Sequence, residues 1–118
     1  HTYKVDKISL DIKTTWEEYN RITGMNCAVD VQESLSICND AHESGKLPEF
    51  EAVTTLVRGH ENDVTHIAPR VRGEYVLQQA WYKSVAPLTE TELINIARGL
   101  NRRVWVRTRD KGQVKVEP

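Results

Sequence analysis

The sequence predicts an α+β domain, in which a mixed or antiparallel sheet carries two to three helices on one side and ends in a C-terminal β-hairpin. Valine and threonine alternate with charged residues on both sides of Asp110–Gly112, a pattern typical of a hairpin. Two segments with apolar residues at helical spacing begin at residues suited to helix N-caps. Several other apolar runs are short and rich in β-branched and aromatic residues, which favours strands.

The chain of 118 residues is long enough to bury one core without metal or disulfide support. We therefore predict a single domain over residues 1–118. The first residue is His1 rather than methionine, which is compatible with excision from a longer chain. With 39% hydrophobic and 28% charged residues, the composition excludes a disordered polycation.

The first part of the chain predicts two strands separated by a short helix. Apolar residues alternate with polar ones from Tyr3 to Ile12 with one change of phase, which indicates a strand with a bend. Thr14 and Thr15 each stand three residues before a glutamate, so a capped helix is expected through Ile22. A short strand is predicted over Met25–Val29.

A longer helix is predicted from Asp30, its N-cap, to Glu43, with Gly45 just past its end. Its buried stripe consists of Val31, Leu35, Cys38 and Ala41. Cys27 and Cys38 predict two thiols in a reducing compartment. A bridge between them is the alternative if Cys27 lies on a strand beside this helix.

The middle of the chain predicts three strands. Phe50–Arg58 and Glu74–Lys83 fit either a helix or a strand, and their β-branched and aromatic content favours strands. Gly59–Asp63 is a polar turn. A short strand is expected over Val64–Ala68, ended by Pro69.

The last helix is predicted to begin at Thr89, with Glu92 completing a capping box. Its buried stripe consists of Leu93, Ile96, Ala97 and Leu100, and its opposite face carries Asn95, Arg98 and Arg102.

A hairpin follows, with Asp110–Gly112 as its loop and Gly112 in the left-handed conformation. This register sets Thr108 opposite Val114, Val106 opposite Val116, and Arg107 opposite Lys115. Facing cations destabilise a ribbon, so the register suggests that an anion binds there.

Charge is unevenly distributed along the chain, although the net charge is only −1. The span from Asp11 to Asp63 holds eleven acidic and four basic residues, a net charge of −7. From Arg98 to Pro118 there are seven basic and two acidic residues, a net charge of +5. Such asymmetry favours an anionic partner at the basic end. Packing of the two ends against each other is the alternative.

The first functional hypothesis is a small non-catalytic module that binds DNA or RNA through its basic helix and hairpin. Arginines would contact phosphates, and an exposed indole would stack on an unpaired base. The predicted contact residues are Asn95, Arg98, Arg102, Arg103, Trp105, Arg107, Arg109 and Lys115. A protein-binding adaptor that uses the acidic half or the hairpin edge is the alternative.

An enzyme is the third hypothesis. His60, Glu61, Asp63 and His66 could bind a divalent metal or cleave a phosphodiester by acid–base chemistry. Their spacing matches no metal-site pattern, so we predict neither a metal nor a cofactor. The sequence contains no membrane-length apolar run and no secretory signal, and we expect a cytoplasmic protein with no membrane contact.

Overall fold

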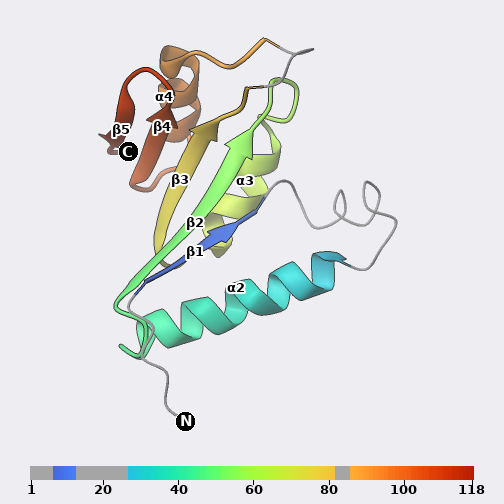
Figure 1. Ribbon diagram of the computed structural model, residues 1–118, viewed down its shortest axis with the longest axis vertical. Helices are drawn as coiled ribbons and strands as arrows, with labels where there is room; N and C mark the ends of the chain where they lie inside the picture. The colour runs from blue at the N-terminus through green and yellow to red at the C-terminus, as the bar shows by residue number, and fades with distance from the viewer. Residues whose placement is uncertain (1–6, 13–26, 82–85) are drawn as a thin grey trace.

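The computed structural model describes residues 7–12, 27–81 and 86–118, which form one sheet with helices packed against it (Figure 1). The α+β prediction is confirmed. The strands are β1 (Lys7–Asp11), β2 (Glu49–Leu56), β3 (Glu74–Gln79), β4 (Val104–Thr108) and β5 (Gly112–Val116). The helices are α2 (Cys27–Glu43), α3 (Asp63–Ile67), the 3-10 helix η1 (Ala68–Arg70) and α4 (Glu90–Arg98).

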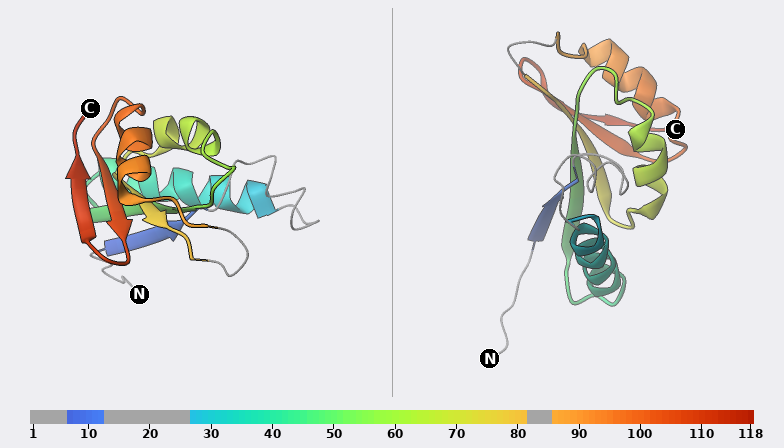
Figure 2. Two further views of the ribbon diagram at one scale, coloured as in Figure 1. Left: turned by 90° about the horizontal axis from the view of Figure 1, so that it is seen from above. Right: turned by 90° about the vertical axis from the view of Figure 1, so that its right-hand side faces the viewer.

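The sheet has the strand order β1-β2-β3-β4-β5. The first four strands are parallel, and β5 returns antiparallel to β4. Each crossover between parallel strands steps to the next neighbour in the same direction. Because such crossovers are nearly always right-handed, successive helices must pass over the same face. Figure 2 shows α2, α3 and α4 on one side of the sheet.

The side that these helices leave uncovered is called the helix-free face here. The strand register assigns its members, because paired residues lie on the same face and neighbours along a strand alternate. They are Lys7, Ser9, Asp11, Glu49, Glu51, Val53, Thr55, Glu74, Val76, Gln78, Trp105, Arg107, Gln113 and Lys115.

The core lies between the sheet and the helices. Leu93 and Ala97 of α4 are fully buried against Val104 and Val106 of β4, as the helical stripe predicts. The capping box is also confirmed, since the Thr89 side chain accepts from the Glu92 backbone while the Glu92 side chain accepts in return. This end of α4 is therefore fixed by local sequence.

Two strand predictions are confirmed and others need correction. Phe50–Arg58 corresponds to β2, and Glu74–Lys83 corresponds to β3, which ends at Gln79; residues 82 and 83 lie outside the described residues. Val64–Ala68 is wrong as a strand, because α3 buries Val64 and Ile67 at a helical spacing of three and Ala68 opens η1. The predicted strand over Tyr3–Ile12 is described only from residue 7, and the helix through Ile22 lies outside the described residues.

The long helix begins at Cys27 rather than after Asp30, so Asp30 is not its N-cap. The described part of the Met25–Val29 strand is helical, and that prediction is wrong. Val29 is β-branched, but a weak local preference does not stop a seventeen-residue helix from extending over it.

Candidate interaction surface

The hairpin forms where predicted, but its pairing is shifted by two residues. The loop is Arg109–Lys111, and Gly112 already pairs with Thr108 at a left-handed φ of 67°. The Lys111 backbone N–H donates to the Thr108 hydroxyl at 3.1 Å and helps to close this loop. A three-residue loop followed by a left-handed glycine is a common hairpin connection.

The shift changes which side chains face one another. Arg107 lies opposite Gln113, and Trp105 lies opposite Lys115. The predicted pairing of Arg107 with Lys115 is therefore wrong. A shift of two leaves every residue on its predicted face, because strand side chains alternate with a period of two. The argument for an anion between facing cations loses its geometric basis.

Carboxylates and amides of other strands meet the hairpin arginines. Arg103 forms an ion pair with Glu74 at 2.8 Å. Arg107 donates to the Gln113 amide oxygen at 2.8 Å and lies 3.5 Å from a carboxylate oxygen of Glu51. The Glu51 side chain is only 14% exposed, so this pair is less screened than one in open solvent.

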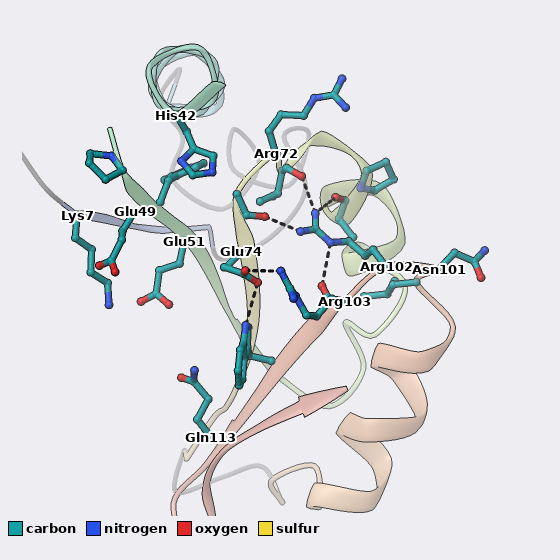
Figure 3. Close-up of a pocket in the computed structure, with 18 residues that line it drawn as sticks. Lys7, His42, Glu49, Glu51, Arg72, Glu74, Asn101, Arg102, Arg103 and Gln113 are labelled. Carbon is teal, nitrogen blue, oxygen red and sulfur yellow. Dashed lines mark hydrogen bonds and ion pairs between the residues drawn. The ribbon is translucent and has the colours of Figure 1, made fainter. Parts of the chain in front are cut away.

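Glu74 is the centre of a small polar network. One of its oxygens accepts from Arg103, and the other accepts from the Trp105 indole N–H at 3.0 Å (Figure 3). This bond holds the half-buried indole of Trp105 in a fixed orientation on the helix-free face. Lys115 has a weaker contact, 3.7 Å from Glu117.

Arg102 is a structural residue rather than a surface cation. Its guanidinium donates to the backbone carbonyls of Ala68, Val71 and Gly73 at 2.6 to 3.0 Å. It also lies 5.8 Å from the centre of the Tyr75 ring. Burial lowers the pKa of Arg102. The residue thus joins the start of β4 to the segment between η1 and β3.

The remaining predicted contact residues do not join this surface. Asn95 and Arg98 are exposed on α4, on the opposite side of the sheet from Trp105. Arg109 lies past the end of β4 with its guanidinium 5.1 Å from the Trp81 ring centre. The structure therefore distributes the eight predicted residues over separate regions.

A cleft of about 840 Å³ opens where the helix-free face meets the amino ends of β2 and β3. Glu49, Glu51 and Trp105 line it from the sheet. In Figure 3, Arg102 and its carbonyl partners form one wall, and Arg72 points away from that wall. Proline and glycine flank the wall, and Gly73 approaches β2 so closely that a Cβ there would overlap the Phe50 carbonyl.

Charge on the helix-free face has both signs. With Arg103, which precedes β4 and bonds Glu74, the face carries four cations and four carboxylates. The carboxylates belong to β1, β2 and β3, whereas three of the cations belong to the β4–β5 ribbon. They are Asp11, Glu49, Glu51 and Glu74, and Lys7, Arg103, Arg107 and Lys115. The two halves of the face are therefore partly neutralised by each other.

The His60–His66 segment is a turn followed by α3. His60 lies 3.5 Å from an Asp63 carboxylate oxygen, while His66 is exposed in the helix. Glu61 accepts from the Gly59 backbone N–H at 2.8 Å, and this bond lowers the pKa of Glu61. No group of three or more His, Cys, Asp or Glu residues among the described residues has the geometry to hold a metal ion. These contacts have the local character of turn stabilisation.

The remaining sequence predictions concern the thiols and the membrane. Cys38 is a buried free thiol, and burial raises its pKa. Among the helices that the structure describes, none is long and apolar enough to cross a membrane.

Comparison with known proteins gives no match for this chain: no protein-family model, no curated protein and no solved structure is similar to it.

Proposed function

We propose that this domain is a non-catalytic binding module whose partner is a protein that docks on the helix-free face. The observation that carries the proposal is the uniform direction of the three crossovers. It leaves a five-stranded face without cover from any described helix. Near its centre Val53 and Val76 are buried, and the largest described apolar side chain is the half-buried indole of Trp105, oriented by Glu74.

The charge pattern favours a protein over a nucleic acid at this face. A nucleic acid presents one sign of charge along its whole backbone and gains affinity by replacing counterions with cations. On the helix-free face, such a polymer leaving the hairpin would meet Glu74 on β3 and then Glu49 and Glu51 on β2. A protein surface can present both signs in complementary positions.

The side chains at the centre suit a protein interface in another respect. Arginine and tryptophan are enriched among residues that dominate binding energy, and they act best when already held in place. Arg103, Trp105 and Arg107 are held by Glu74, Gln113 and Glu51. Little conformational entropy would be lost when a partner covers them.

Site-specific photo-cross-linking tests this proposal. A photoreactive residue at Ser9, exposed on the helix-free face, is compared with the same residue at Thr65, exposed on α3. In an extract of the producing cells, we expect a discrete protein adduct from position 9 that excess unmodified domain competes away. Nuclease treatment should leave it unchanged. Equal adducts from both positions, or an adduct that nuclease removes, would contradict the proposal.

A second candidate function is contact with single-stranded nucleic acid at Trp81 and Arg109. Trp81 is 49% exposed, and the guanidinium of Arg109 lies over its ring. No ion pair to Arg109 occurs among the described residues. An unpaired base could stack on the indole while a phosphate contacts the guanidinium.

The number of cations without an ion-pair partner determines how steeply oligonucleotide binding should weaken with salt. One neutralised phosphate on a single strand gives a log–log salt slope of about −0.7, against about −3.5 for five. Quenching of tryptophan fluorescence by an oligonucleotide, measured at two salt concentrations, gives the slope. We expect a shallow slope that depends on Trp81 and Arg109 and is unchanged in Arg98→Ala. A steep slope would restore the whole basic ribbon as the binding surface, and no quenching at low salt would remove this candidate.

A further inference from the structure

Strand β5 is one of the two edge strands of the sheet, at the opposite edge from β1, and nothing described lies beyond it (Figures 1 and 2). Its residues Gly112, Gln113 and Lys115 are exposed. Within the described chain, its backbone is paired with β4 alone, so the groups that point outward have no backbone partner. Strand β5 contains no proline, and an edge of this kind is a template for another strand.

The sequence around β5 discriminates among the ways in which two copies could pair there. Two copies related by a two-fold axis must pair their β5 strands antiparallel. The helices of both copies then lie on the same side of the joined sheet only if one residue of β5 faces its own copy across the axis. An axis at Gln113 sets Lys111 against Lys115 of the second copy, twice. An axis at Lys115 sets that lysine against its own copy. Facing like charges destabilise both arrangements.

An axis at Val114 produces no facing like charges. Lys111, the last residue of the loop, then lies beside Glu117 of the second copy, and Glu117, just past the end of β5, lies beside its Lys111. Gln113 faces Lys115, so an amide oxygen can accept from an ammonium group. Val114 faces Val114, and Gly112 faces Val116. Because the interface is isologous, every pair occurs twice except Val114 with Val114, which lies on the axis.

We infer that the β5 edge binds a second copy of this chain by antiparallel pairing around a two-fold axis at Val114, forming a continuous ten-stranded sheet. The ion pairs that select this register join Lys111 to Glu117 across the axis. The inference is independent of the protein partner proposed above, because it uses the sheet edge rather than the helix-free face.

The helices leave room for this pairing. Helix α4 packs mainly on β4, so the two α4 helices would be separated by about three strand spacings, roughly 14 Å. Helices in contact lie at about 8–10 Å, so the two copies would not collide. Only a short edge is buried on each side, which places the dimer among weak, concentration-dependent associations. Glu117 must also leave its 3.7 Å contact with Lys115.

Sedimentation velocity over a range of protein concentrations tests the inference. The wild-type chain should show a monomer–dimer equilibrium. Lys111→Glu and Glu117→Lys should each weaken the dimer about tenfold, because each sets two like charges against each other at two symmetric positions. The double variant Lys111→Glu with Glu117→Lys restores opposite charges in both pairs and should recover the wild-type dissociation constant.

Lys46→Glu, at an exposed turn away from the edge, is the control because it changes net charge by the same amount as Lys111→Glu. Circular dichroism establishes that each variant is folded. A wild-type chain that stays monomeric up to millimolar concentration would overturn the inference. So would a double variant no tighter than the single ones, or a Lys46→Glu variant as weak as Lys111→Glu.

Discussion

The phenol oxygen of Tyr75 lies 2.7 Å from the hydroxyl oxygen of Thr54, and both side chains are buried on the helix side of the sheet. The two hydroxyls form a hydrogen bond between the adjacent strands β2 and β3. Burial raises the pKa of Tyr75, which keeps the phenol protonated and able to donate.

Tyr75→Phe should therefore lower the free energy of unfolding by about 1–2 kcal/mol, because the Thr54 hydroxyl loses its partner in the core. The double variant Tyr75→Phe with Thr54→Val should lose less free energy of unfolding than the sum of the losses in the two single variants. Urea unfolding of the four proteins measures this coupling. Strictly additive effects would show that the two hydroxyls do not depend on each other.

The ion pair between Arg58 and Glu92 predicts sensitivity to acid. The hydrogen bond from Arg58 is the largest cause that lowers the pKa of Glu92 from 4.5 to about 2, and the Thr89 backbone adds to it. A group with a depressed folded-state pKa stabilises the fold above its unfolded pKa, and this contribution is lost as pH falls toward 2. Wild-type Tm should fall between pH 4.5 and 2 more steeply than that of Glu92→Gln. Glu33→Gln, at an exposed position of α2, is the control and should follow the wild-type curve.

Gly73 should not tolerate a side chain. A Cβ there would overlap the Phe50 carbonyl oxygen and lie 2.7 Å from the Phe50 ring, so the backbone of β2 or of the preceding loop must shift. Gly73→Ala should destabilise the fold by about 1–3 kcal/mol. At Gly99, whose φ is −73°, the nearest atom to a Cβ is 3.4 Å away, and Gly99→Ala should be neutral or stabilise by about 0.4–1 kcal/mol. Thermal unfolding of the two variants separates the predictions, and similar losses would contradict them.

Arg102 should affect stability rather than binding. Arg102→Ala leaves the three carbonyls without their common donor and should cost about 2–4 kcal/mol in denaturant unfolding. Arg102→Lys should recover only part of that loss, because one ammonium group lacks the planar fork that reaches all three oxygens. Arg98→Ala, exposed on α4, should change stability by less than about 0.5 kcal/mol. An Arg102→Ala variant as stable as Arg98→Ala would show that the carbonyls are satisfied by water.

The elements that the sequence predicts well are those fixed by neighbours in the chain. Thr89 and Glu92 define the start of α4 through a contact three residues long. The hairpin is likewise local, and Gly112 marks its turn. The predicted hairpin register differs from the observed one by two residues. The sequence allows Gly112 to be either the last residue of the loop or the first residue of β5. Only the pairing of Thr108 with Gly112 decides between them.

The elements and contacts that sequence reasoning missed depend on distant residues. Helix α3 has β-branched residues that favour a strand, and burial of Val64 and Ile67 outweighs that preference. The partners of Arg103 and Arg107 come from β3 and β2, strands whose alignment no local pattern reveals. The alternative that the acidic and basic ends neutralise each other was therefore partly realised, through Glu51 and Arg107. Trp81, which is 49% exposed, is not among the predicted contact residues.

The chain steps from β1 to β4 in one direction across the sheet, and this has a consequence for how additional strands could be inserted during evolution. In a doubly wound sheet the chain starts at a central strand, adds strands toward both edges, and covers both faces with helices. Here each strand after β1 lies next to the strand that precedes it in the sequence. A duplicated strand–helix unit, inserted ahead of the terminal ribbon, would extend the array without rethreading any existing segment. The fold is thus a short series of parallel strand–helix units that ends with the antiparallel strand β5.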